Sequence, residues 1–455
     1  MRSLRRWLTP GMGIKRWLGL VFLGELALAL AGALLLRQAY RDLDVTGPLQ
    51  AFLFVITLQF LPNAARALVL IAAGGVLLGI GFARLMTVLV GPFAGPEPLS
   101  EVIYQRRLLA RGPRIVAIGG GTGLSVLLRG LKQRTSNLTA IVSVADDGGS
   151  SGRLRETYGW TPMGDIRNCI AALANAEPLM TSLLQYRFPA EPADADPGVA
   201  GQPGLAGHAF GNLLIAAMSD IEGDFEEGVR QVNRVLAVRG QVIPASGRPL
   251  TLHAALDDGT QVDGQSSVAR ARGIERVWIT PEAPDACSDA VDAILSADIV
   301  VLGPGSLYTS LLPSLLVPAI GDAVRHAPGL VIYACNVATQ VGETEGYDLA
   351  AHYLALERHT GPGIVDVVLG NSELGAPRAP GDQAGPVRLS WPPELSLGAR
   401  PAEGTPPLPE VALVLRDVVD PDNAHFHQPE LLTSAILEIA ARHTSRRTFV
   451  AAKTA

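Results

Sequence analysis

Short runs of aliphatic residues alternate with amphipathic segments from Arg114 onward. The aliphatic runs are apolar throughout, which is typical of strands in a sheet that is covered on both faces. They lie near Ile115–Ile118, Ala140–Val144, Ile299–Leu302, Leu330–Ala334, Ile364–Leu369 and Val411–Leu415. The helical segments lie at Leu124–Lys132, Asp165–Ala174, Ala209–Met218, Phe225–Val238, Asp289–Ser296, Leu349–Glu357 and Pro429–His443. This order predicts an α/β fold with a doubly wound parallel sheet.

Three stretches interrupt this alternation. Leu250–Leu256 and Gln261–Gly264 are joined by the turn sequence DDGT, which predicts a β-hairpin inserted into the fold. Phe188–Gly207 is rich in Pro, Ala, Gly and Asp and is expected to form a long loop. Residues 372–409 are rich in Pro and Gly and predict a further excursion from the sheet.

The first hundred residues contain two long hydrophobic runs. Residues 17–36 carry a single charge, Glu25, and are long enough to cross a hydrocarbon core of about 30 Å. Residues 67–90 are interrupted only by Arg84, whose long side chain can reach the membrane interface. The pattern predicts two transmembrane helices. Residues 51–61 are apolar but short, and whether they also cross the membrane is left open.

Basic residues flank both predicted spans, including Arg5 and Arg16 before the first and Arg106 and Arg107 after the second. Both flanks are therefore expected on the cytoplasmic side. This divides the chain into a membrane hairpin and linker at 1–112, a large domain at 113–445 and a short tail at 446–455. The large domain is expected in the cytoplasm, held at the cytoplasmic membrane.

Charge is distributed unevenly along the chain. Residues 1–114 contain 13 Lys and Arg against 5 Asp and Glu, whereas the remainder contains 24 against 38. An acidic body argues against nucleic acid as the main partner, since binding to a phosphate backbone requires a basic face. Cys169, Cys287 and Cys335 are far apart and odd in number, so they support neither a disulfide framework nor a structural zinc site.

The sequence IVAIGGGTGLS, residues 115–125, predicts a strand, a glycine-rich turn and the start of a helix. Glycines there adopt positive φ at little cost and leave backbone N–H groups free to form a nest at the positive end of the helix, which suits phosphate. A tight turn that only allows close packing is the alternative. The predicted phosphate-binding residues are Gly120, Gly121, Thr122 and Gly123.

This turn matches two other known glycine-rich motifs, the P-loop and the dinucleotide fingerprint, less well. No lysine follows the glycines, which argues against a P-loop ATPase. The dinucleotide fingerprint is met only in part, because Leu124 stands where its last glycine belongs. We therefore expect neither NAD nor a flavin.

Paired carboxylates follow the second predicted strand. The blocks ADDGGSSGRLR and MGDIRN contain Asp146, Asp147, Arg153, Asp165 and Arg167. Asp146 stands where a ribose-binding carboxylate is found, and the arginines are expected to bind phosphate. Asp147 with Asp165 is a candidate Mg²⁺ site, because this ion is held by few carboxylates together with waters and a substrate phosphate. Turn formation and helix capping explain the same aspartates equally well.

Three further blocks place polar groups at the ends of predicted elements. GHAFGNLL puts His208 and Asn212 four residues apart, on one face of a helix. DIVVLGPGSLYTSLLP repeats the glycine turn, and YACNVATQVGETEGY ends another strand in polar residues. Turns of this kind face one crevice if their strands are neighbours. The nucleotide-binding set is completed by His208, Asn212, Gly303, Gly305, Ser306 and Asn336.

Six blocks together, AIGGGTGLS, VSVADDGGSSGRLR, MGDIRN, GHAFGNLL, VVLGPGSLYTSLLP and CNVATQVGETEGY, resemble the YvcK proteins, or gluconeogenesis factors, within the CofD-like family. The resemblance implies a Rossmann-like nucleotide-binding fold. Its YvcK branch implies binding of UDP-sugars such as UDP-N-acetylglucosamine, with a role in cell shape and cell-wall synthesis during gluconeogenic growth. Its CofD branch transfers a 2-phospholactyl group to a deazaflavin with Mg²⁺ held by aspartates, which correspond to Asp147, or its neighbour Asp146, and Asp165.

The leading hypothesis is a membrane-tethered regulator that binds a nucleotide sugar without turning it over and acts on proteins of envelope synthesis. The alternative is a Mg²⁺-dependent phosphoryl-type transferase, in which the metal neutralises developing charge. The sequence does not decide which sugar is bound, nor whether the chain forms homo-oligomers.

Overall fold

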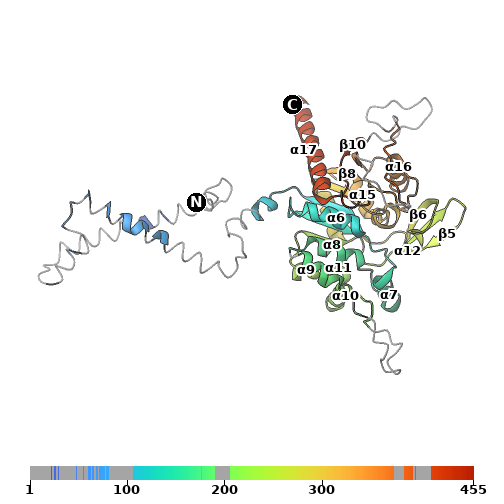
Figure 1. Cartoon of the computed structure of the whole chain (residues 1–455), viewed down its shortest axis with the longest axis horizontal. Helices are drawn as coiled ribbons and strands as arrows, with labels where there is room; N and C mark the ends of the chain where they lie inside the picture. Colours follow the sequence, from blue (N-terminus) through green and yellow to red (C-terminus); the bar gives the residue numbers. More distant parts are fainter. Residues whose placement is uncertain are drawn as a thin grey trace, which may run out of the picture. The chain divides into compact units, whose positions relative to one another are not determined.

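The computed structural model describes residues 106–175, 177–189, 205–372, 384–392, 395 and 411–454, with side chains to 443, and scattered residues before 81. The chain forms two compact units, Met1–Leu108 and Leu109–Ala455. Figure 1 shows its strands and helices in order along the chain.

A seven-stranded sheet lies at the centre of the second unit, with strand order β10-β9-β8-β7-β1-β2-β3. Every neighbouring pair is parallel. The strands are β1 Ile115–Gly119, β2 Leu138–Val142, β3 Gln241–Pro244, β7 Ile299–Leu302, β8 Leu330–Ala334, β9 Val367–Asn371 and β10 Ala412–Arg416. The predicted α/β class and parallel sheet are confirmed.

Helices cover the sheet in two groups. One contains α6 (Gly121–Leu131), which packs against α8 (Gly164–Leu173) and α17 (Pro429–Thr454), and the other contains α14 (Leu312–Leu315), α15 (Pro318–Arg325) and α16 (Leu349–Thr360). The chain runs from β1 toward β3 and then from β7 toward β10. Right-handed crossovers that run in opposite directions along a sheet leave their helices on opposite faces, which makes the sheet doubly wound.

Along the chain, the remaining helices lie mainly between β2 and β3 and on either side of β7. They are α7 Gly149–Tyr158, α9 Glu177–Gln185, α10 Phe210–Glu222, α11 Phe225–Val235, α12 Gln265–Val268, α13 Ser288–Ser296 and the π-helix η2 Leu307–Leu311. Helix α17 continues to Thr454 and so includes nearly all of the residues expected to form a tail.

The inserted hairpin belongs to a separate three-stranded sheet with the order β5-β4-β6. Strands β4 (Thr251–Leu256) and β5 (Gln261–Asp263) are the predicted pair, and they are antiparallel. The third strand, β6 (Ile274–Thr280), is not predicted although its sequence IERVWIT contains several strand-forming residues.

A single hydrophobic core joins the sheet to its helices. It includes the fully buried β1 side chains Ile115 and Ile118, and Leu124, Leu127 and Leu128 on the inner face of α6. This spacing buries one face of α6 while its first turn stays at the carboxyl edge of the sheet. The core therefore fixes the glycine-rich turn between β1 and α6.

The first predicted span, residues 17–36, and the short run at 51–61 lie almost entirely outside the described residues, as do residues 81–90 of the second span. Among the residues that were described, no single helix is long and apolar enough to cross a membrane. One pair, Leu307–Leu315 with Pro318–Arg325, meets the length and composition only when joined across an 83° bend.

Candidate functional site

Two glycine turns meet at the point where the strand order reverses. Strands β1 and β7 are neighbours, and each is followed by a turn, Gly119–Gly123 and Gly303–Ser306. A Cβ atom built on Gly123 would lie 2.6 Å from the carbonyl oxygen of Pro304, so only glycine allows the two turns to touch. The expectation that both turns face one crevice agrees with this packing, and such switch points are where open α/β sheets bind ligands.

A cavity of about 530 Å³ opens beside these turns, at the carboxyl ends of β1, β7 and β8. Among the described residues that line it there is no lysine or arginine. Its walls include Gly120, Gly121, Thr122, Gly123, Asp165, Gln265, Gly305, Ser306, Ser310, Asn336, Gln340 and the segment His425–His427. Eight of the predicted site residues therefore lie on one cavity.

The first turn of α6 faces this cavity. Gly120 is the N-cap, and no side chain of its own caps the helix. Gly121 has φ +63°, a left-handed conformation that favours glycine, and a Cβ built on it would meet only the Ser310 hydroxyl within 4 Å. Thr122 is exposed. The open side of Gly121 thus lies at the positive end of an 11-residue helix, where backbone N–H groups suit an anion.

Asp165 lies beneath the same turn, at the start of α8, where the Gly121 amide donates to its carboxylate. Burial and the nearby Asp146 raise its pKa to about 6. Burial, together with the charge of Asp147, also raises the pKa of Asp146 against the hydrogen bond from the Gly148 amide at 3.0 Å. Both carboxylates have pKa values raised by burial, and Asp146 also raises that of Asp165, so a cation beside this acid pair would be stabilised.

Asp147 lies elsewhere. Its Oδ1 accepts a hydrogen bond from the Ser266 amide at 2.8 Å, which ties the loop after β2 to the inserted sheet. Of the two aspartates considered as the partner of Asp165, it is Asp146 whose charge acts on Asp165, whereas Asp147 is bonded to the inserted sheet. Among the described residues, no group of three or more His, Cys, Asp or Glu side chains could hold a metal. A two-carboxylate site suits Mg²⁺ only when a phosphate and waters complete its coordination.

Asn336 shapes the second glycine turn. Its Oδ1 accepts from the Gly305 amide at 3.1 Å, and its Nδ2 donates to the Gly305 carbonyl at 2.9 Å. The side chain thus mimics a paired strand and fixes Gly305 and, through it, Ser306. Gly303 has φ +79°, so this turn too requires a left-handed residue.

Glu343 supports the other side of this turn and was not predicted. It is buried, and its Oε1 accepts hydrogen bonds from the amides of Tyr308 at 2.7 Å and Thr309 at 3.1 Å in the first turn of η2. Burial raises its pKa to about 7 despite these bonds. A π-helix next to a ligand cavity is a common feature of functional sites. The sequence signal was the block GETEGY, which contains Glu343 without indicating its partner.

Four of the predicted residues form a polar cluster on the α7 and α10 side of the acid pair. Arg167 is buried and donates to Asn212 Oδ1 at 3.0 Å, while its charge lowers the pKa of Asp165. The Ser150 hydroxyl lies 3.2 Å from both His208 Nδ1 and Asn212 Nδ2. Arg153 donates to the Ala206 carbonyl at 3.2 Å. None of these four is among the residues that line the glycine cavity.

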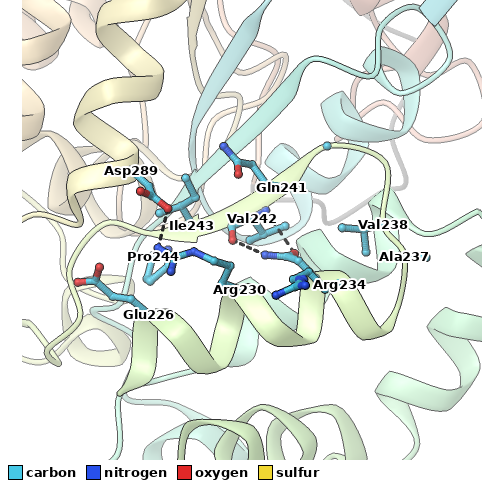
Figure 2. A pocket seen from close by; sticks show the side chains of 12 residues that line it. Glu226, Arg230, Arg234, Ala237, Val238, Gln241, Val242, Ile243, Pro244 and Asp289 are labelled. Atoms are coloured by element: carbon cyan, nitrogen blue, oxygen red, sulfur yellow. Dashed lines mark hydrogen bonds and ion pairs between the residues drawn. The ribbon is translucent and has the colours of Figure 1, made fainter. Parts of the chain in front are cut away.

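A second hollow, of about 270 Å³, lies along the edge strand β3, between α11 and the start of α13 (Figure 2). Its Arg230 donates to Asp289 at 2.7 Å. Asn233 donates to the Val242 carbonyl at 2.8 Å and so covers part of the open sheet edge. No predicted site residue lines this hollow, which lies at the edge of the sheet and not at the glycine turns.

Comparison with known proteins gives the family. The family model described as 2-phospho-L-lactate transferase CofD matches residues 115–384. The gluconeogenesis factor of Listeria monocytogenes is 37% identical over 336 residues, covering 74% of this chain and 98% of its own. The chain belongs to the gluconeogenesis factor family. Its central domain is of the CofD type.

Other relatives extend this similarity. The gluconeogenesis factor of Bacillus subtilis is 49% identical over 266 residues, covering 58% of this chain and 80% of its own. A Nostoc sp. protein that carries the same name provisionally is 42% identical over 444 residues, covering 95% of this chain and 92% of its own. A crystal structure of a Bacillus halodurans protein, 41% identical, covers 72% of this chain and 100% of its own with a TM-score of 0.62.

Proposed function

We propose that this family member is a regulator that binds a nucleotide sugar, with a UDP-sugar such as UDP-N-acetylglucosamine in the glycine cavity. The observation that carries the proposal is the open first turn of α6, where Gly121 presents its backbone to a cavity at the sheet's switch point. Backbone amides at a helix N-terminus suit a diphosphate. The proposed role is in cell shape and cell-wall synthesis under gluconeogenic growth, and the names of the relatives bear only on the growth condition.

Mg²⁺ accompanies the diphosphate in this proposal. Because no lysine or arginine is among the described residues that line the cavity, the helix terminus alone would have to offset the diphosphate charge. Asp165 lies at this turn on the cavity wall, and the charge of Asp146 acts on it, so the two would supply the few carboxylates that Mg²⁺ prefers. The ion would bind these carboxylates and phosphate oxygens together. We expect neither NAD nor a flavin to be needed.

A transferase is the second candidate, and the polar cluster favours it. The charge of Arg167 acts on both Asp165 and Asp146, and Asn212 and Ser150 connect Arg167 to His208. Neither Arg167 nor His208 lines the glycine cavity, so in a transferase they would hold a second anionic substrate beside the acid pair. The matching family model also describes a transferase. In this case the metal would neutralise charge that develops during phosphoryl-type transfer.

Recovery of the ligand separates the two candidates. Purified full-length chain is incubated with UDP-N-acetylglucosamine and Mg²⁺, and the nucleotide is then analysed by mass spectrometry. The regulator predicts intact ligand bound at about one equivalent. Release of a cleaved or transferred product above the level of an Asp165→Asn control would exclude the regulator and support the transferase.

We also propose that the chain is tethered to the cytoplasmic membrane by residues 1–112, with the large domain in the cytoplasm, near its partners in envelope synthesis. The two hydrophobic runs and their basic flanks support this, and the Nostoc relative matches most of the chain. Fractionation is expected to place the full chain in the membrane pellet, resistant to carbonate extraction. Recovery in the soluble fraction would contradict the tether.

A further inference from the structure

The segment between β10 and α17 folds back over the carboxyl end of the sheet. Val419 and His427 form an antiparallel bridge, and the Gln428 amide donates to the Val418 carbonyl at 2.9 Å. His427 is buried, and its Nε2 lies 3.1 Å from the Cys335 carbonyl at the end of β8. Burial lowers the pKa of His427 to about 4, so the ring is neutral at pH 7 and donates through Nε2. The segment is thereby fixed to β8.

The anchoring of this segment sets the position of Phe426. It lies between His425 and His427, lines the glycine cavity, and is 37% exposed. An exposed aromatic ring on the wall of a mainly polar cavity offers a stacking surface, and stacking does not depend on which base is present because every base has a π-face. The segment His425–His427 therefore places an aromatic residue on the cavity wall.

The distance across the cavity suits a nucleotide. Strands β1, β7 and β8 are consecutive neighbours, so the ends of β1 and β8 lie about 10 Å apart at the usual strand spacing. The glycine turn follows β1, and Phe426 precedes His427, which is bonded to the residue after β8. A nucleotide whose diphosphate lies on the first turn therefore has its base near Phe426.

Gln340 supplies a polar group on the same side of the cavity. Its Nε2 donates to the Ser306 hydroxyl at 2.7 Å, which holds the side chain in place. Its Oε1 is buried and has no hydrogen-bond partner among the described residues. A buried carbonyl oxygen without a partner is costly, and a ligand N–H group would satisfy it.

We propose that Phe426 and Gln340 form the nucleobase end of the cavity. The Phe426 ring stacks on the base, and Gln340 Oε1 accepts a hydrogen bond from an N–H group at the edge of the base. This inference rests on the proposed function, because it assumes that the diphosphate of the same ligand lies on the first glycine turn.

The test compares a ligand that has a base with one that has none. Binding of UDP and of inorganic pyrophosphate, each with Mg²⁺, is measured by calorimetry on the full chain. Phe426→Ala is expected to weaken UDP binding by about 5- to 150-fold, the range for loss of one stacked base, and to leave pyrophosphate binding within about twofold. Phe426→Tyr keeps the aromatic ring and is expected to retain UDP binding. Phe426→Leu keeps only the apolar character of the side chain and is expected to lose UDP binding.

The outcomes are distinguishable. Unchanged UDP binding by Phe426→Ala, with a wild-type chain that binds both ligands, overturns this inference and leaves the proposed function standing. An equal loss of UDP and pyrophosphate binding also overturns it, because Phe426 would then act on the cavity as a whole. A wild-type chain that binds neither ligand overturns the proposed function and this inference together.

Discussion

Asparagine in place of Asp165 is expected to weaken binding of UDP or a UDP-sugar, measured with Mg²⁺ present, by roughly 100-fold or more. The neutral amide removes one of two negative charges that hold the ion. A unit charge about 4 Å from another contributes about 4 kcal/mol at an effective dielectric constant of about 20. Asp146→Asn is expected to act in the same direction. Calorimetric titration of each variant measures the effect.

Asp147→Asn is the matched control. Asp147 accepts its hydrogen bond from the Ser266 amide, and an asparagine oxygen can accept the same bond. This variant is therefore expected to bind within about threefold of wild type. A large loss with Asp147→Asn and none with Asp165→Asn would show that the metal pair is the one favoured by the sequence pattern and not the one favoured by the structure.

The same Asp165→Asn variant should make the ligand-free chain more stable. The folded pKa of about 6 lies above the ordinary 3.8, so the protonated form favours folding at low pH and this contribution is lost as pH rises through 6. This rise in pKa corresponds to a loss of about 3 kcal/mol in the free energy of unfolding at neutral pH. Asparagine carries no charge, so Asp165→Asn would avoid this loss. Higher stability with lost binding is typical of a residue kept for function. The affinity of the wild-type chain for Mg²⁺ is expected to decrease at pH values below about 6, because Asp165 is then protonated.

The second large effect is expected from substitutions at two glycines of the first turn, one of which should affect binding and the other stability. Gly121→Val is expected to abolish diphosphate binding, because its side chain would fill the open space where the ligand approaches. The left-handed backbone adds a cost of about 1–2 kcal/mol in stability. Gly123→Ala has its Cβ 2.6 Å from the Pro304 carbonyl oxygen, so it is expected to destabilise the fold by about 1–3 kcal/mol or more by forcing the two turns apart.

Thermal unfolding and ligand titration together check this pair. Thr122→Ala changes an exposed residue of the same turn and serves as the control, with stability expected to stay within about 0.5 kcal/mol of wild type. If Gly121→Val bound UDP normally while remaining folded, the ligand would not approach the backbone of this turn.

Much of the fold follows from local sequence. Six strands of the main sheet and the β1–turn–α6 unit are predicted because buried parallel strands are continuously apolar and because glycine marks the turns. Strand β3 is missed because the apolar run between Gly240 and Pro244 is very short. Proline is tolerated in this strand because β3 lies at the edge of the sheet. The third strand of the insert is missed because its partner β4 is remote in sequence.

The site is predictable as a set of residues but not as a set of contacts. Helix α7 is missed because Gly149 and Gly152 lower helix propensity, yet Gly152 is needed where the helix start lies against the Asp147 carbonyl. Adjacent aspartates differ in role because the chain turns between them, which no pattern of residue types reveals. Phe426 is 300 residues from the first turn, and only the strand order brings the two onto one cavity.

A crystal structure of the chain with UDP-N-acetylglucosamine and Mg²⁺ would show directly where the diphosphate binds. We expect diphosphate oxygens within hydrogen-bond distance of the backbone amides at Thr122 and Gly123, since the Gly121 amide already donates to Asp165, and we expect the ion to be bound by Asp165 and Asp146. A nucleotide whose phosphates lie instead on Arg153 and His208, away from the glycine turn, would contradict this expectation.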